Sequence, residues 1–164
     1  MNIYIRLFGA AFIMLSALFA GREYSRFSDK RSSELRGFLL FVRHIGGQVA
    51  NFLSYGDELF SGFENQSLQS CGFLPALREG ADFADAFESS KKKLSIPSSQ
   101  SEMLGDFFAS FGRDYREGEI EKITAFLEKY EKEVDRECEN MTKNLQVARA
   151  LLLGGALWAG IMAM

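Results

Sequence analysis

The sequence has few of the residues on which catalytic and metal sites usually depend. It contains one histidine and two cysteines among 164 residues, and the cysteines, Cys71 and Cys138, form no CxxC pair. The single histidine lies within no nucleophile motif. The glycine pair of Gly46-Gly47-Gln48 lacks the lysine and the hydroxyl residue of a phosphate-binding loop. We therefore predict no enzyme activity, and no catalytic residue, cofactor, metal or small-molecule substrate.

The sequence also lacks an excess of basic residues and has little that interrupts a helix. Its net charge is −3, which gives no reason to expect nucleic-acid binding, because that function normally needs a basic face. It has only two prolines, and β-branched residues are few. This composition favours helices over strands. We predict an all-α protein.

Charge is scarce at the two ends of the chain. Residues 3–20 read IYIRLFGAAFIMLSALFA and residues 147–164 read VARALLLGGALWAGIMAM, with Arg6 and Arg149 as their only charges. Each run is near the short limit for crossing a hydrocarbon core of ~30 Å. We predict one transmembrane helix over residues 1–21, a helical-bundle domain over residues 22–146, and a second transmembrane helix over residues 147–164.

Each end segment has an alternative interpretation. The first could be a cleaved signal peptide, since Ala20-Gly21 offers small residues for cleavage, although Leu18 occupies a position where a small residue is preferred. The last could be a buried core helix, but a chain of this size has little with which to cover a helix that is apolar all round. A cleaved leader with a carboxyl-terminal anchor would describe an exported, tail-anchored helical domain.

The basic residues predict how the chain is oriented. Five of them follow the first apolar run, namely Arg22, Arg26, Lys30, Arg31 and Arg36. By the positive-inside rule the middle domain is cytoplasmic and both termini are outside.

The last apolar run also carries small residues at a spacing that permits helix packing. Gly155 and Ala159, like Ala156 and Gly160, lie four residues apart, which lets a neighbouring membrane helix approach closely. We predict these four residues as a membrane-helix packing face.

Two long helical stripes dominate the middle of the chain. The first has apolar residues or glycine at Leu35, Phe38, Leu39, Val42, Ile45, Gly46, Val49, Phe52 and Leu53, and the second at Ile120, Ile123, Leu127, Tyr130, Val134, Cys138, Met141 and Leu145. Steps of three and four residues are typical of one face of a helix. Because both anchors leave the same membrane face, we predict an antiparallel helical hairpin in which the stripes face each other. Gly37, Gly46 and Gly47 in the first of these helices indicate either a close helix contact or a bend.

Shorter helical segments lie between these stripes. We predict a turn at residues 55–57 and helices over residues 66–78, 82–92 and 98–115. Ser98 or Ser99 would cap the last of these, with Glu102 completing a capping box. This segment carries an aromatic stripe that would form either core or an exposed partner-binding face, made of Phe107, Phe108, Phe111 and Tyr115.

The order of these pieces resembles a known family. The stretch GREYSRFSDKRSSELRGFLLFVRHI, the turn near YGDELF, the segment ADFADAFESS and then LGDFFASFGRDYREGEIEKI follow one another between two apolar ends. Phe107, Phe111 and Gly112 match a phenylalanine–glycine pattern before a polar turn. In order and spacing over nearly the whole chain, the sequence resembles the stage III sporulation protein AB family of endospore-forming bacteria.

This resemblance implies a fold and a role. The fold would be a helical bundle similar to the cytoplasmic domains of platform protein F of type II secretion systems. The role would be that of a non-enzymatic membrane platform or adaptor subunit of the transenvelope complex between mother cell and forespore, in the mother-cell membrane around the forespore. Its partners would be a secretion-type cytoplasmic ATPase, other membrane components of that complex, and membrane lipid. The alternative setting is a platform component of a type II secretion or type IV pilus system.

Overall fold

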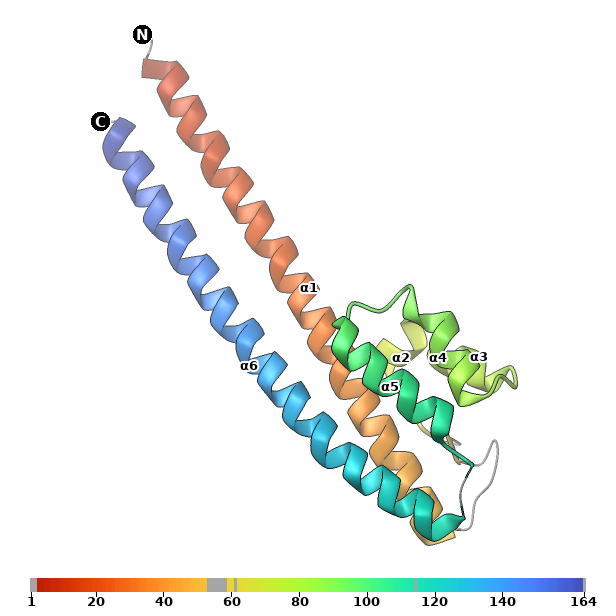
Figure 1. The fold of residues 1–164 in the computed structure, drawn as a ribbon. Coiled ribbons are helices and arrows are strands. Elements are labelled where there is room, and N and C mark those ends of the chain that lie inside the picture. Colours follow the sequence, from red (N-terminus) through yellow and green to blue (C-terminus); the bar gives the residue numbers. More distant parts are fainter. Residues whose placement is uncertain (1–2, 53–58, 61, 114, 164) are drawn as a thin grey trace. The chain divides into compact units, whose positions relative to one another are not determined.

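The computed structural model describes residues 3–52, 59–60, 62–113 and 115–163, with backbone alone for several residues of the two terminal stretches. This part of the chain is all-α, as predicted. Its helices are α1 (Ile3–Phe52), α2 (Gln66–Ser70), α3 (Phe73–Arg78), α4 (Phe83–Lys91), α5 (Ser98–Ser110) and α6 (Arg116–Ala163), shown in Figure 1. The chain divides into two compact units. We call Lys30–Glu137 the bundle unit, and Met1–Asp29 with Cys138–Met164 the terminal unit.

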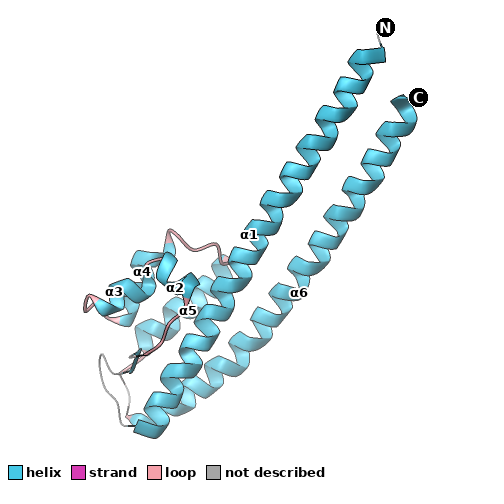
Figure 2. Cartoon of the chain, turned by 180° about the vertical axis from the view of Figure 1, so that it is seen from behind, coloured by secondary structure: helices cyan, strands magenta, loops and turns pink. Residues whose placement is uncertain are grey.

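Within the bundle unit, α1 and α6 pair in antiparallel fashion (Figures 1 and 2). Arg31 on α1 forms an ion pair of 2.6 Å with Glu137 on α6, near the start of the α1 segment and the end of the α6 segment. At the opposite end, Arg116 Nε donates a hydrogen bond of 3.0 Å to the carbonyl oxygen of Val49. Residue numbers thus rise along one helix as they fall along the other. The predicted helical hairpin is confirmed.

The two predicted stripes face the interior of this unit. On α1, Leu35, Phe38, Val42 and Ile45 are completely buried. On α6, the buried positions of the stripe in the bundle unit are Ile123, Tyr130 and Val134. Spacing by three and four residues therefore places one apolar face of each helix against its neighbours, which is the arrangement that removes most apolar surface from water.

Gly37 and Gly46 of α1 serve close packing, and none of the glycines breaks the helix. α1 continues through all of them to Phe52. A Cβ atom at Gly37 would lie 3.0 Å from Asn65 Oδ1, and one at Gly46 would lie 2.8 Å from Ile123 Cγ2. Of the two readings left open by the sequence, close helix contact is the correct one. The predicted turn at residues 55–57 lies outside the described residues.

The segment predicted as one helix over residues 66–78 is two helices. Gly72 adopts φ +95°, a left-handed conformation that glycine accepts far more readily than other residues, and it separates α2 from α3. Asn65 caps α2, because its Oδ1 accepts hydrogen bonds from the amides of Ser67 and Leu68. Asp82 caps α4 in the same way through the amide of Asp85, at 2.7 Å.

The predicted helix over residues 98–115 is shorter than expected and has a different cap. Pro97 is the N-cap residue of α5 and makes no side-chain capping bond, so the predicted capping box at Ser98 or Ser99 is wrong. The helix ends at Ser110, because Phe111 is extended (ψ 140°) and Gly112 follows with φ +80°. Figure 2 shows α2 to α5 as short helices joined by loops.

Candidate interaction site

An aromatic cluster holds the short helices against α1 inside the bundle unit. Phe108 of α5 is 2% exposed and lies near its centre. Its ring centroid is 5.3 Å from that of Phe73 on α3, 5.5 Å from Phe87 on α4, and 6.2 Å from both Phe38 and Phe41 on α1. Such pairs add stabilisation beyond the apolar area that they bury. One residue thus connects four helices.

The structure separates the four residues of the predicted aromatic face. Phe107 is buried and stacks on Phe126 of α6, with ring centroids 4.2 Å apart. Phe111 is half-buried and lies 5.1 Å from Phe83. Tyr115 is 94% exposed, because α5 has ended before it and the stripe no longer continues. Phe107, Phe108 and Phe111 are therefore gathered in one cluster, and Tyr115 lies apart from it on the surface.

Two aromatic residues of the long helices belong to the cluster but fall outside the stripes that the sequence suggested. Phe41 is completely buried, and its ring lies 5.1 Å from that of Phe73. Phe126 stacks on Tyr130 at 5.2 Å, and Tyr130 is itself buried, with its hydroxyl donating to the carbonyl oxygen of Leu35 at 3.5 Å. A signal was present, since Phe126 precedes Tyr130 by four residues and so lies on the same helix face.

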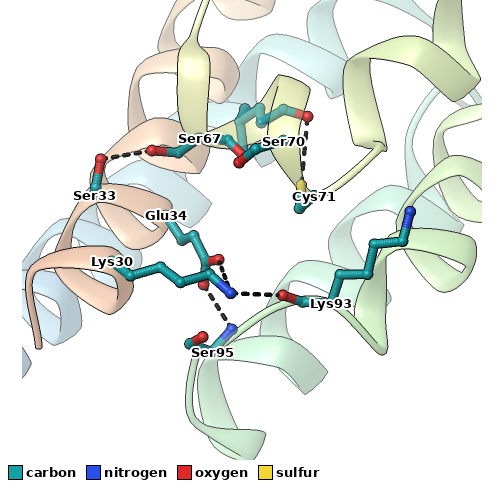
Figure 3. A network of polar contacts seen from close by, with 9 residues as sticks. Lys30, Ser33, Glu34, Ser67, Ser70, Cys71, Lys93 and Ser95 are labelled. Atoms are coloured by element: carbon teal, nitrogen blue, oxygen red, sulfur yellow. Dashed lines mark hydrogen bonds and ion pairs between the residues drawn. The ribbon is translucent and has the colours of Figure 1, made fainter. Parts of the chain in front are cut away.

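A polar network joins α1 to the loop after α4 (Figure 3). Glu34 is 1% exposed, and its Oε2 accepts a hydrogen bond of 2.6 Å from the amide of Ser95. Lys30 Nζ lies 3.6 Å from Glu34 Oε1 and donates a hydrogen bond of 3.1 Å to the carbonyl oxygen of Lys93. The network thus attaches residues 93–95 to the Lys30 end of the bundle unit.

The carboxyl group of Glu34 has an unusual electrostatic environment. Burial raises the pKa of Glu34, and the amide of Ser95 and the charge of Lys30 oppose that rise without cancelling it. The sequence shows Lys30 and Glu34 four residues apart, but in the order opposite to the one that best stabilises a helix. Nothing in the sequence marked Glu34 as buried.

The hydroxyl and thiol groups beside this network have structural roles. Ser33 on α1 and Ser67 on α2 share a hydrogen bond of 2.6 Å. Cys71 is buried, and its Sγ donates to the carbonyl oxygen of Leu68 at 3.4 Å. Burial raises the pKa of the Cys71 thiol. Because the thiolate is the reactive form, this environment suits a packed side chain better than a nucleophile.

The described part of the chain offers no group of three or more His, Cys, Asp or Glu residues that could hold a metal ion. His44 packs against Phe63, with ring centroids 5.2 Å apart. Its buried Nε2 has no hydrogen-bond partner among the described residues. The arrangement around His44 is that of a ring at the edge of the aromatic cluster.

The terminal unit exposes large apolar side chains. Phe12 is 73% exposed and Phe19 68% on α1, and Leu151 is 71% exposed on α6. Among the described residues, no helix combines the length and the apolar character that crossing a membrane requires. Of the predicted helix-packing residues, Gly155 is exposed. The side chains of the other three, Ala156, Ala159 and Gly160, lie outside the described residues.

A long helical hairpin carries a small aromatic-cored bundle, and its buried polar groups hold helices together. This is a helical scaffold. The chain belongs to the family described as stage III sporulation protein AB, which matches residues 6–164. Neither the curated proteins nor the solved structures contain a match to it.

Family membership fixes the general setting. It implies that the protein takes part in the stage III sporulation complex, and this family is not known as one of enzymes. The suggested likeness to platform protein F of type II secretion stays a prediction, because no solved structure matches the chain.

Proposed function

We propose that this protein is a non-enzymatic membrane platform or adaptor subunit of the stage III sporulation complex. Helices over residues 1–21 and 147–164 anchor it in the mother-cell membrane around the forespore. The domain over residues 22–146 lies in the cytoplasm, and both termini lie outside. The domain presents a rigid helical surface to a partner and performs no chemistry of its own.

The observation that carries the proposal is the exposure of apolar side chains in the terminal unit. Burying a Leu or Phe side chain fully is worth about 1.5–3 kcal/mol, so leaving Phe12, Phe19 and Leu151 in water forfeits much of that stabilisation. In the hydrocarbon core of a membrane these side chains would no longer be exposed to water, so this loss of stabilisation would not occur. The apolar sequence of both runs, each with one arginine, supports the same environment.

The bundle unit supports an adaptor role through its rigidity. The aromatic cluster and the paired long helices hold its surface in a fixed shape, which lowers the ordering cost of binding a partner. Among the described residues of this unit, Tyr115 is the most exposed large hydrophobic side chain, and tyrosine is favoured at protein interfaces. We infer that the exposed surface around Tyr115 docks a partner, while Phe107, Phe108 and Phe111 stabilise the bundle that carries this surface. A secretion-type cytoplasmic ATPase fits this role. The small residues at 155, 156, 159 and 160 would contact other membrane components.

Membrane anchoring is tested with the full-length chain expressed in cells. Reporters of topology fused to either terminus should report the outside, and one inserted at Glu79, in an exposed loop, should report the cytoplasm. The chain should stay in the membrane pellet after alkaline carbonate extraction. Removal of residues 147–164 should change the side that the carboxyl terminus reports. Complete release of the intact chain by carbonate would contradict the proposal.

The adaptor role is tested by complementing a strain that lacks the gene. That strain should begin sporulation normally and then arrest in forespore development. Tyr115→Glu should restore sporulation poorly while the protein accumulates at its normal level. Leu40→Glu is the matched control, because Leu40 is an exposed apolar residue of the same unit (49%) outside the proposed docking surface. Normal sporulation without the gene would rule out the role, and equal complementation by both variants would rule out the surface.

A further inference from the structure

Three consecutive lysines end α4 and begin the loop after it, at the Lys30 end of the bundle unit. Lys91, Lys92 and Lys93 are all exposed. The chain enters the bundle unit at Lys30 and leaves it at Glu137, and the ion pair between Arg31 and Glu137 joins α1 to α6 at this end. The hydrogen bond from Lys30 to the carbonyl oxygen of Lys93 keeps the lysine run there.

The network of Figure 3 fixes the position of the run. Two contacts from successive turns of α1, through Lys30 and Glu34, attach residues 93 and 95. A mobile loop would lose conformational freedom on meeting a surface, whereas an attached one has already lost much of it. The exposed lysine side chains are therefore attached to a constrained backbone.

From this placement we propose that Lys92 and Lys93 form a contact surface for the headgroups of anionic lipids in the leaflet that faces the cytoplasm. The proposal rests on the membrane anchoring argued above. Lys91 is assigned a smaller part, because its Nζ lies 3.0 Å from Glu88 Oε1.

The short sequence separation between Lys30 and the proposed first anchor limits how far the run can lie from the membrane surface. α1 is continuous, and Lys30 follows Gly21 by nine residues, which corresponds to about 14 Å of helix rise. A headgroup layer occupies roughly 5–7 Å of that distance. About 8 Å remain, close to one Debye length at physiological ionic strength.

Aromatic side chains in the intervening segment agree with this position. Tyr24 and Phe27 are 40% and 49% exposed on α1 between the apolar run and Lys30. Aromatic residues are enriched where a protein meets the headgroup region, and arginines such as Arg22 and Arg26 flank them here. A basic residue after α4 also favours the dipole of that helix, so stability has to be measured beside lipid binding.

The test uses the full-length chain in phosphatidylcholine vesicles with spin-labelled phosphatidylglycerol or spin-labelled phosphatidylcholine. The motionally restricted fraction of each label gives the preference for the anionic lipid. Lys92→Gln with Lys93→Gln should lower this preference about threefold, since each lysine near a surface attracts anionic lipid and the effect decays over a Debye length. Salt at 1 M should remove the difference from the wild type.

The matched control is Lys129→Gln with Lys132→Gln, which removes the same charge from two exposed positions of α6. These residues precede Val147 by 18 and 15 positions, or about 27 and 22 Å of helix, so they should leave the lipid preference unchanged. Thermal unfolding of both variants is measured alongside, and an equal Tm together with a selective loss of preference supports the proposal.

Three results would overturn it. An unchanged preference in the Lys92 and Lys93 variant, in a chain that still resists alkaline extraction, would remove the lipid contact and leave the anchors standing. An equal loss in both variants would show a general charge effect. Release of the chain from the vesicles by alkaline buffer would overturn the anchoring and, with it, this inference. In the first of these cases, failure of the same variant to complement the strain that lacks the gene would indicate that the run binds an acidic protein surface instead.

Discussion

A Cβ atom placed on Gly46 would lie 2.8 Å from Cγ2 of Ile123, closer than real Cβ contacts come. Ile123 is 3% exposed and cannot move outward freely. Gly47, the next residue of α1, has nothing within 4 Å of the same position. Two adjacent glycines of one helix therefore differ in their reason for being there: the first permits close approach of α6, and the second does not.

This difference predicts opposite effects of two neighbouring substitutions. Gly46→Ala gains about 1 kcal/mol of helix propensity but overpacks the contact with Ile123, at a cost of about 1–3 kcal/mol, so the chain should become less stable by about 1 kcal/mol. Gly47→Ala should stabilise it by up to about 1 kcal/mol. Urea unfolding of the full-length chain in detergent measures both. Equal gains from the two substitutions would show that the helices do not approach closely at Gly46.

The ion pairs between α1 and α6 should differ in strength according to their burial. Arg31 and Glu137 are 22% and 21% exposed and lie 2.6 Å apart. Arg43 and Glu131 lie 3.0 Å apart but are 53% and 47% exposed. Double-mutant cycles with alanine should give a coupling of about 2 kcal/mol for the first pair and less than about 1 kcal/mol for the second, which water and salt screen. The reverse order would contradict the pairing at the Lys30 end.

Phe108 and Tyr115 belonged to one predicted stripe and should respond very differently to truncation. Phe108→Ala removes the ring that connects four helices and should cost about 3–5 kcal/mol. Tyr115→Ala alters a side chain that is 94% exposed and should change stability by less than about 0.5 kcal/mol. Thermal and urea unfolding measure both effects. A large loss with Tyr115→Ala would mean that this residue packs against the bundle.

The hairpin could be predicted from the sequence because it depends on a repeating pattern. Apolar residues at helical spacing recur over many turns in both long helices, and each repeat strengthens the same prediction. Position-specific effects were harder. The break at Gly72 and the early end of α5 at Ser110 each depend on one or two backbone angles. The stripe could not show whether Tyr115 still belonged to the helix.

The polar network could not be predicted for a different reason. Lys30, Glu34 and Ser95 come together only because the loop after α4 returns to α1, about 60 residues further along the chain. A carboxylate on a helix with alternating charges is normally solvated, but Glu34 is buried and hydrogen-bonded to this loop. The local sequence around Glu34 therefore gives no signal that predicts this contact.

Burial of Glu34 leads to a testable pH dependence. Its pKa is raised above the ordinary value of 4.5, so the folded chain holds this proton at pH values where the unfolded chain has released it. The neutral carboxyl therefore favours folding below pH 4.5, and that contribution is lost as the pH rises through the folded pKa. Glu34→Gln retains an oxygen that accepts from the Ser95 amide and cannot ionise. It should match the wild type near pH 4 and be more stable than it at pH 7.

Urea unfolding of both proteins across this pH range measures the effect. Glu139→Gln is the control of opposite sign, because its hydrogen bond with Lys143 lowers the pKa of Glu139. The wild type should be slightly more stable than this control at pH 7, and the difference should vanish as the pH falls through the lowered pKa. If the gap between wild type and Glu34→Gln stayed constant from pH 4 to pH 7, Glu34 would be solvated, and the loop after α4 would not be held on α1 as Figure 3 shows.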